Sequence, residues 1–411
     1  MNAKRQTGFT LIEVMIAMLI GIIGIVVMMQ TFAVSEGFKR TATSGTDAQV
    51  NGSVALYMLE REIRVAGYGM NGYLPAVGAA PNNVYCSSIR VWNTATGTGQ
   101  DMRILPFEIN PAGIPAGDPS TDVIVIGFGT SDSVVAGVQA NQPTSTLDDF
   151  IMTSGKDGFR QGDLVVAVQP GTLATDPASC VLHEITSATN AVNTCGAGPT
   201  TDLKHGVTTY KSANAACAFV TPRFNSSSGI KDAGGATVPA IKLASGGQLF
   251  NLGNPSLKAY AIRNGNLTSC DMLASNCTNV ANYVVVVNDI VSLRAVYGRD
   301  TLPALPAPQD FQVDVWDRAP IPTLADASRV MAVMIEVTAR SGLKEKPATG
   351  AACTTLADST RPDKVMDWIG GSVVGAGIDV NPSNLPPGDW ACYRYKLYQT
   401  RVPIRNMSWR P

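Results

Sequence analysis

The sequence predicts an α+β protein in which antiparallel β-sheet packs against the exposed half of one long N-terminal helix. Residues 9–66 have helical patterning, and the first proline of the chain is Pro75. Beyond that helix, short runs of β-branched residues bounded by turn residues recur to the end of the chain. With 39 glycines and 25 prolines in 411 residues, the composition suits strands and loops rather than a helical bundle.

The chain begins with a short basic segment, residues 1–8, that contains Lys4 and Arg5 and ends in Gly8. A long apolar run starts at Phe9. An ordinary secretory signal has its small-residue cleavage site after the apolar region, whereas here the boundary between Gly8 and Phe9 precedes it. Cleavage at this boundary would leave the apolar helix in the mature protein.

Residues 9–34 predict a membrane-spanning helix. Glu13 is the only ionisable side chain among them, and the run is long enough to cross a hydrocarbon core of about 30 Å. Because Lys4 and Arg5 precede the run, the positive-inside rule places residues 1–8 in the cytoplasm and everything after residue 34 outside it.

The first sixteen residues, MNAKRQTGFTLIEVMI, resemble the class III signal of type IV pilins and of type II secretion pseudopilins. The resemblance implies that a prepilin peptidase cleaves between Gly8 and Phe9 and methylates the new amine of Phe9. It also implies that the chain assembles with others like it.

Glu13 has two interpretations, because a carboxylate in an apolar helix costs about 2.5 to 3.5 kcal/mol at mid-bilayer and needs a reason. One is that it lies near the helix start, where it reaches the interface and favourably opposes the N-terminal dipole. The other, implied by the resemblance, is that it pairs with the Phe9 amine of a neighbouring subunit and sets register. Gly21 and Gly24 indicate either ordinary tolerance of glycine in membrane helices or close packing of helices.

The helix is predicted to continue as an amphipathic segment over residues 35–66. Glu36 with Arg40, and Glu60 with Arg64, are spaced as (i, i+4) ion pairs with the acid first. One face carries an apolar stripe made of Ala55, Met58, Leu59, Ile63 and Ala66. The sequence Gly-Tyr-Gly at residues 67–69 predicts the end of the helix.

Residues 67–411 predict a β-rich extracytoplasmic domain, large enough for a substantial core. Its clearest strand signals are residues 122–127, 163–168, 283–287, 329–337 and 393–398. A division of this domain near Gly253 is a further expectation.

The second half of the helix and four later segments resemble the PilW family of minor pilins. Residues 54–69 (VALYMLEREIRVAGYG) resemble the run that leads from helix to globular domain in that family, with Glu62 at its acidic position. The later segments are residues 162–166 (GDLVV), 180–186 (CVLHEIT), 288–298 (NDIVSLRAVYG) and 400–409 (TRVPIRNMSW).

Eight cysteines, all outside the membrane segment, predict up to four disulfides in an oxidising compartment. We expect Cys270 to pair with Cys277, Cys180 with Cys195, and Cys353 with Cys392, which leaves Cys86 and Cys217 as further candidates. A thiolate metal site is the competing interpretation, but the sequence has no C-x-x-C pair.

The titratable residues and the net charge of the chain do not favour catalysis, a bound cofactor or direct nucleic-acid binding. His183 and His205 are the only histidines, and we expect structural or solvated roles for both because neither lies in a catalytic or metal motif. Asp148 and Asp149 are expected to be solvated, with a calcium site as the alternative. A net charge of −1 gives no basic footprint for nucleic acid.

The resemblance implies a minor type IV pilin, held in the inner membrane with its C-terminal domain in the periplasm until it joins a pilus at the cell surface. It implies these partners: other minor pilins, the major pilin, the prepilin peptidase and the inner-membrane platform of the pilus. We expect it to join a priming or tip complex that promotes pilus assembly, with twitching motility and adhesion following from the pilus.

Three alternatives remain open at this stage. The first is a J-type pseudopilin of type II secretion, which shares the signal and an enlarged domain. The second is an adhesin at the pilus tip. The third is a membrane-tethered periplasmic enzyme, for which the sequence offers no catalytic constellation.

Overall fold

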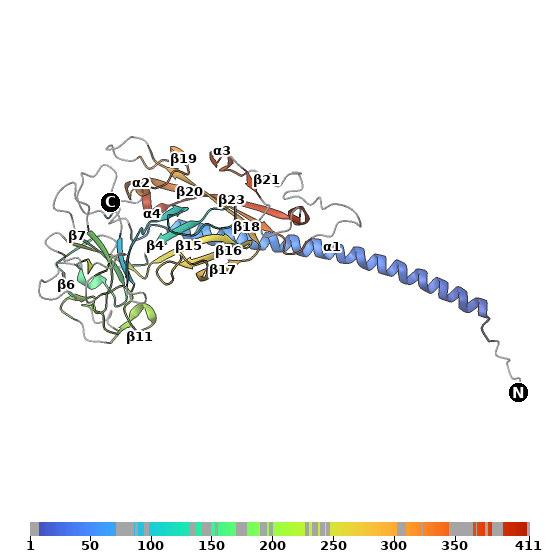
Figure 1. Cartoon of the computed structure of the whole chain (residues 1–411), viewed down its shortest axis with the longest axis horizontal. Coiled ribbons are helices and arrows are strands. Elements are labelled where there is room, and N and C mark those ends of the chain that lie inside the picture. Colours follow the sequence, from blue (N-terminus) through green and yellow to red (C-terminus); the bar gives the residue numbers. More distant parts are fainter. Residues whose placement is uncertain are drawn as a thin grey trace, which may run out of the picture.

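The computed structural model describes residues 8–70, 86, 89–93, 98–131, 137–141, 149–152, 155–169, 179–189, 195–196, 200–226, 230–231, 237–238, 243, 247–301, 310–321, 324–344, 365–366, 368–374, 377–379 and 389–408. A long helix projects from one end of a β-rich body (Figure 1). The predicted fold class, one long N-terminal helix with a large and mainly antiparallel β domain, is confirmed.

Helix α1 (Leu11–Val65) contains 55 residues and is about 80 Å long at about 1.5 Å per residue. Its first half projects from the body, and its second half lies along the sheets (Figure 1). The predicted apolar stripe is buried there: Ala55, Leu59, Ile63 and Ala66 are fully buried, and Met58 packs against the same core. The helix ends as expected, because Gly67 and Gly69 have φ of 78° and 74°, in the left-handed region that stops a helix.

A four-stranded antiparallel sheet receives the second half of α1. Its order is β19 (Val315–Asp317), β18 (Ile290–Arg299), β20 (Val330–Arg340) and β23 (Tyr395–Pro403). Strands β20 and β23 supply most of the contact with α1. This sheet therefore anchors the helix to the body.

Strand β23 runs alongside α1 in the same direction. The Tyr398 hydroxyl donates to the Gln49 carbonyl at 3.1 Å, and after the strand the Asn406 side-chain amide donates to the Val65 carbonyl at 3.0 Å. These two attachment points are about 24 Å apart along the helix, and they hold β23 and the segment after it in line with α1. Gly52 makes the close approach possible, because an added Cβ would overlap the Tyr398 ring.

A five-stranded antiparallel sheet lies beside the first one. Its order is β17 (Val284–Val287), β16 (Asn266–Asp271), β15 (Ser256–Arg263), β4 (Ile124–Phe128) and β3 (Phe107–Ile109). The two outermost strands, β17 and β3, form its edges.

An eight-stranded sheet lies at the end of the body away from the projecting helix (Figure 1). Its order is β2 (Thr98–Met102), β1 (Ile89–Asn93), β8 (Ser179–Glu184), β7 (Leu164–Gln169), β14 (Gln248–Gly253), β5 (Val138–Asn141), β6 (Asp149–Met152) and β9 (Leu203–Lys204). One pair, β1 with β8, is parallel.

The remaining elements are short. Three two-stranded sheets join β10 (Tyr210–Ser212) to β11 (Ala218–Val220), β12 (Ile230–Lys231) to β13 (Thr237–Val238), and β21 (Val365–Met366) to β22 (Ile378–Asp379). The short helices are η1 (Lys156–Gly158), η3 (Ala213–Ala215), η4 (Val280–Asn282), α2 (Leu324–Ser328), α3 (Gly371–Val374), η5 (Asp389–Cys392) and α4 (Arg405–Ser408).

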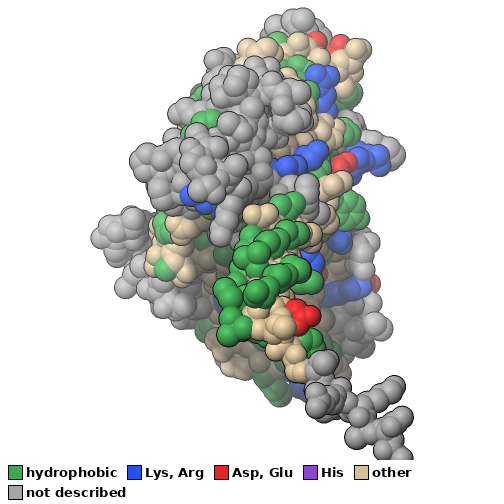
Figure 2. Space-filling view, turned by 90° about the vertical axis from the view of Figure 1, so that its right-hand side faces the viewer, with side chains coloured by type: hydrophobic (Ala, Val, Ile, Leu, Met, Phe, Trp, Pro, Cys, Tyr) green, Lys and Arg blue, Asp and Glu red, His purple; other side chains and the backbone are tan. Residues whose placement is uncertain are grey.

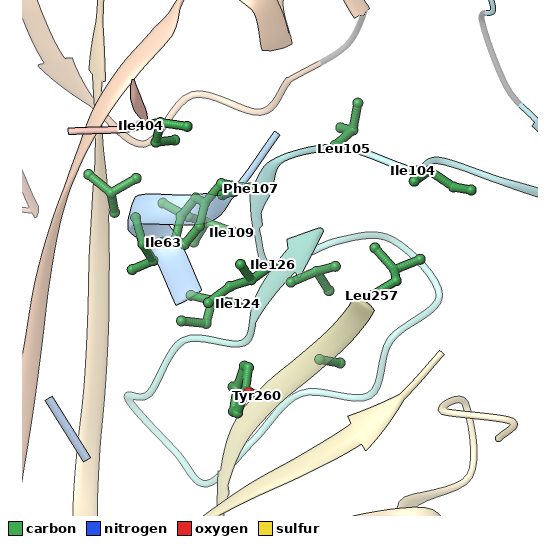
Figure 3. Close-up of a cluster of buried hydrophobic side chains, with 14 of the residues drawn as sticks. Ile63, Ile104, Leu105, Phe107, Ile109, Ile124, Ile126, Leu257, Tyr260 and Ile404 are labelled. Atoms are coloured by element: carbon green, nitrogen blue, oxygen red, sulfur yellow. The ribbon is translucent and has the colours of Figure 1, made fainter. Parts of the chain in front are cut away.

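The main hydrophobic core joins α1 to the sheets. Figure 3 shows Ile63 of α1 close to Phe107 and Ile109 of β3 and to Ile124 of β4. A second cluster fills the eight-stranded sheet around Phe150 and Phe159, and a third lies on the other face of the four-stranded sheet around Trp368 and Tyr395. The described residues of the body thus form three separate apolar clusters.

The five predicted strand signals correspond to β4, β7, β17, β20 and β23. At Gly253 the chain passes from β14 of the eight-stranded sheet toward β15 of the five-stranded sheet, whereas β3 and β4 reach the five-stranded sheet from earlier in the chain. The expected domain division near Gly253 stays a prediction.

One of the expected disulfide pairings is wrong. Cys180 is bonded to Cys86, and Cys195 to Cys217, instead of Cys180 to Cys195. The reason is the parallel pairing of β1 with β8, which brings the segment before β1 next to the start of β8.

The expected bridge between Cys270 and Cys277 is present. Cys392 is also disulfide-bonded, and Cys353, its expected partner, lies outside the described residues.

Candidate assembly site

The N-terminus of α1 is held by a capping box between Thr10 and Glu13. The Glu13 backbone N–H donates to the Thr10 hydroxyl oxygen at 3.4 Å, and the Thr10 backbone N–H donates to the Glu13 carboxylate at 3.0 Å. The Thr10 hydroxyl also donates to this carboxylate at 3.1 Å. Glu13 is therefore partly satisfied inside its own chain.

This capping box could have been found in the sequence. Thr10-Leu-Ile-Glu13 matches the pattern of a hydroxyl residue followed three positions later by Glu, directly before an apolar run. Both hydrogen-bonding residues lie after the boundary between Gly8 and Phe9, so the box would survive cleavage there. Phe9 precedes the cap and is 88 % exposed.

The first half of α1 presents apolar side chains on all its sides. Residues Leu11–Glu36 have a mean hydropathy of 2.8, and none of this segment is buried in the structure. Figure 2, seen from the side of the projecting helix, shows its hydrophobic side chains in a continuous group with an acidic side chain near its end. By length and composition this segment can cross a membrane.

Gly21 and Gly24 lie within this exposed segment. No atom comes within 4 Å of a Cβ added at either position. Both glycines therefore leave open space on the helix surface, and close packing of another helix there stays a prediction.

The other end of α1 is held in place by contacts that involve residues 54–69 and 400–409, two of the segments that resemble the PilW family. The Asn406 amide donates to the carbonyl oxygens of Val65 and Ala66, at 3.0 and 3.1 Å, and the Val65 carbonyl also accepts from the Tyr68 N–H at 3.2 Å. The Gly67 N–H donates to the Gly127 carbonyl at 2.9 Å. The helix end is thereby joined both to β4 and to the segment after β23.

Glu62 links the last turns of α1 to β15. Its carboxylate accepts from the Tyr260 hydroxyl at 2.6 Å and lies 3.3 Å from the Lys258 ammonium nitrogen. Burial, followed by the nearby Glu62 carboxylate, raises the pKa of Tyr260, so the hydroxyl keeps its proton and donates. The acidic position of the motif therefore has a structural role.

A groove of about 810 Å³ runs beside these last turns of α1. Glu62, Tyr68 and Asn406 help to line it, together with the cations Arg61, Arg64, Lys258 and Arg405 and the apolar side chains Val54, Tyr57, Met58, Val65 and Phe128. Its lining suits contact with another protein surface and contains no nucleophile paired with a base.

His183 and His205 have structural positions, and neither is solvated. The two rings lie 4.4 Å apart between centroids, and His205 stacks on Phe150 at 4.1 Å. Burial lowers the pKa of His183 to about 4, and burial together with the His183 charge lowers that of His205 well below its usual value. Both rings are therefore neutral at pH 7.

Of the two neighbouring aspartates singled out in the sequence, Asp149 forms an ion pair with Lys204 at 2.7 Å, and Asp148 lies outside the described residues. Within the part of the chain that the structure describes, no group of three or more His, Cys, Asp or Glu side chains is arranged to hold a metal ion.

Two family models match the chain. Residues 3–29 match the prokaryotic N-terminal methylation motif, and residues 258–406 match Type IV Pilus-assembly protein W. No curated protein and no solved structure matches it. The first match contains Phe9, Thr10 and Glu13, and the second contains Lys258, Tyr260 and Asn406, so each end of α1 is built partly from a matched segment.

Proposed function

The chain is a PilW-like type IV pilus protein, and from this premise we propose that it is a minor pilin that joins a priming or tip complex and promotes assembly of the pilus. The observation that carries the proposal is the N-terminal methylation motif at the start of an apolar helix that no described part of the chain covers. An uncovered apolar helix needs a membrane or other helices around it.

The proposed course begins in the inner membrane. The prepilin peptidase cleaves between Gly8 and Phe9 and methylates Phe9, and the β-rich body stands in the periplasm. The mature helix then leaves the lipid and packs against the helices of other minor pilins and of the major pilin, helped by the inner-membrane platform. Twitching motility and adhesion follow from the assembled pilus.

Glu13 supplies the register of this packing in the proposal. Its carboxylate retains lone pairs beyond those used by Thr10, because an ionised carboxylate accepts about four hydrogen bonds. A methylated amine of a neighbouring Phe9 is a donor that fits them, and an ion pair in an apolar surrounding is strong. The capping box presents the carboxylate at the helix start, where such an amine would lie.

The test is to shear surface filaments from producing cells and to search them by mass spectrometry for this chain. We expect peptides of the chain, including one that begins at methylated Phe9, together with the major pilin. A Gly8→Ala variant is the matched control: it should remain an unprocessed precursor in the membrane and be missing from the filaments.

Two outcomes would contradict the proposal. Normal processing of Gly8→Ala would remove the assignment of the cleavage site. A processed chain that stays in the membrane while the cells make normal pili would instead favour the pseudopilus of a type II secretion system.

A further inference from the structure

Strand β17 is an edge strand with exposed apolar side chains on both its faces. It pairs with β16 on one side, through Thr268 with Val285 and Ser269 with Val284, and no described strand pairs with its other side. Val284 is 69 % exposed, Val285 49 % and Val286 39 %. An edge of this kind offers a row of backbone donors and acceptors to another strand.

The edge lacks the features by which sheets usually avoid such pairing. Residues 280–288 (VANYVVVVN) contain no charged side chain and no proline. Edge strands are normally protected by lysines, prolines, inward charges or a covering loop. Four consecutive valines at an open edge would be an aggregation hazard unless another protein covers them.

The turn before β17 is held rigidly. The Cys270–Cys277 disulfide joins β16 to this turn, and the Asn282 side-chain amide donates to the Asn276 carbonyl at 2.8 Å. The Asn279 side chain caps helix η4 by accepting from the Ala281 N–H at 3.0 Å.

Both ends of β17 are also fixed. At its start, the Arg263 guanidinium lies over the Tyr283 ring, 4.2 Å from the centroid. At its end, the Asp289 N–H donates to the Asn266 side chain at 3.0 Å. A strand fixed in this way loses little conformational entropy when a partner binds, which favours affinity.

We propose that β17 is a docking strand, to which an edge strand of a different pilin subunit adds by β-augmentation. This inference rests on the proposed function, because it takes the partner from the same assembly. Strand β17 contacts α1, so it lies next to the helix that carries the proposed assembly. A neighbour whose helix packs against α1 brings its own sheet to this edge.

The chemistry of β17 defines the partner strand. Side chains opposite Val284 and Val286 must be uncharged, because a charge buried against valine without a partner is costly. The main chain supplies affinity through the ladder of hydrogen bonds, and the alternating valines supply specificity.

A second copy of this chain does not fit as a partner that pairs through its own β17. In a two-fold antiparallel pair of β17 strands, the symmetry axis is perpendicular to the sheet and reverses everything that lies along the sheet. Helix α1 packs along these sheets. The two α1 helices would therefore point in opposite directions, whereas insertion into one membrane makes them parallel.

The test uses the full-length chain in producing cells. A benzophenone amino acid is placed at position 284, cross-linked by light, and the product is identified by mass spectrometry. We expect a cross-link to an edge strand of another protein that carries the N-terminal methylation motif. The matched control is position 219, where Phe219 is 72 % exposed on β11 of a separate sheet and should give no such product.

A second measurement uses the double variant Val284→Lys with Val286→Lys. It should be processed, inserted and disulfide-bonded normally, yet fall about tenfold or more in sheared filaments, because two unpaired charges would be buried in the docked pair. Phe219→Lys should enter filaments as the wild type does.

The outcomes separate this proposal from the proposed function. Wild-type filament levels for the double variant, or a position-284 product that is lipid, a second copy or absent, would overturn the docking strand and leave the minor-pilin proposal standing. If the wild-type chain itself is missing from filaments, the minor-pilin proposal fails, and the cross-link formed in the membrane still decides whether β17 docks a strand.

Discussion

Glu13 combines two chemical tasks in one carboxylate. Through Thr10 it closes the capping box of its own helix, and in the proposed assembly it also faces the amine of a neighbour. The structure shows the local partner of Glu13, which is Thr10. Its pairing with the Phe9 amine of another subunit stays a prediction. The two roles are separable because Thr10 takes part only in the first.

We predict that Glu13→Gln is inserted and processed but falls about tenfold or more in sheared filaments, because the charge that meets the neighbouring amine is lost. Thr10→Ala keeps that charge and loses only the cap, which is worth about 1 kcal/mol, so it should assemble within about twofold of wild type. Immunoblots of filaments and membranes measure both. Equal losses in the two variants would reduce Glu13 to a capping residue.

The buried histidine pair makes the eight-stranded sheet sensitive to acid. His183 has a folded pKa of about 4 against about 6.5 unfolded, so its contribution to stability is present above pH 6.5 and is lost as pH falls through 4. The loss amounts to about 3 kcal/mol for this ring. His205 is shifted in the same direction and adds to the loss.

We predict that His205→Phe loses less unfolding free energy than wild type between pH 7 and pH 4.5. The substitution removes one buried group that must be charged and keeps a ring against Phe150. Urea unfolding of the detergent-solubilised chain, followed by circular dichroism, measures the difference. The same acid loss in both proteins would mean that other groups control it.

At the scale of elements, the course of α1 and its terminating glycines can be predicted from the sequence, whereas the side chain that caps its C-terminal end cannot. The apolar stripe and the terminating glycines of the helix are local patterns, and both were predicted correctly. The Asn406 cap is not local, because 341 residues separate it from Val65, and periodicity carries no information across such a distance. Only the shared resemblance of the two segments indicated that both matter.

We predict that Asn406→Ala destabilises the helix end by about 1 kcal/mol, because two carbonyl oxygens lose a donor. Asn406→Asp should cost more, since a carboxylate would face those carbonyls and the negative end of the helix dipole. Protection of amide hydrogens in residues 59–66, measured by exchange and mass spectrometry, reports the loss. An Asp variant as protected as wild type would contradict the capping role.

The disulfides also show that local sequence patterns do not predict contacts between strands that are distant in the sequence. Nearness in the sequence suggested Cys180 with Cys195, but the parallel pairing of β1 and β8 brings Cys86 to Cys180 from 94 positions away. The bridge between Cys270 and Cys277 closes a hairpin-sized loop, and such a local pairing can be predicted without knowing the sheet order.

On the scale of the whole molecule, separate clusters give different parts of the body different responses to pH. Glu336 lies fully buried in β20, where Ser292 donates to it at 2.9 Å and Thr338 also donates to it. Burial raises its pKa to about 7 from 4.5, against the lowering effects of the Thr338 and Ser292 hydrogen bonds and of Arg294, and Asp122 adds to the rise. Its stabilising neutral form is fully present below pH 4.5 and is lost as pH rises through 7.

We therefore predict opposite pH responses in the two sheets. Hydrogen exchange, corrected for intrinsic rates, should show the eight-stranded sheet losing protection below pH 6.5 and the four-stranded sheet losing it as pH rises from 4.5 to 7. Glu336→Gln should abolish the second change, of about 3 kcal/mol, and leave the first intact. Parallel changes in both sheets would show that the body opens as one unit.

The sequence predicted the fold class, the long helix and five strands, because each depends on local composition and periodicity. It did not predict the sheet order, the Thr10–Glu13 box or the exposure of β17. A run of valines such as residues 283–287 predicts a strand, but it does not show whether the strand lies at an open edge or in the buried centre of a sheet. The two cases are distinguished by the structure, in which β16 is the one described strand that pairs with β17.

The alignment of α1 with β23 has a mechanical consequence. A retracting filament would pull on the projecting half of α1 along the helix axis. Because β23 and the segment after it run beside the helix over about 24 Å, from Tyr398 at Gln49 to Asn406 at Val65, that load acts as shear along the whole contact. The hydrogen bonds and packing contacts between α1 and this segment then share the force and must break together instead of one after another.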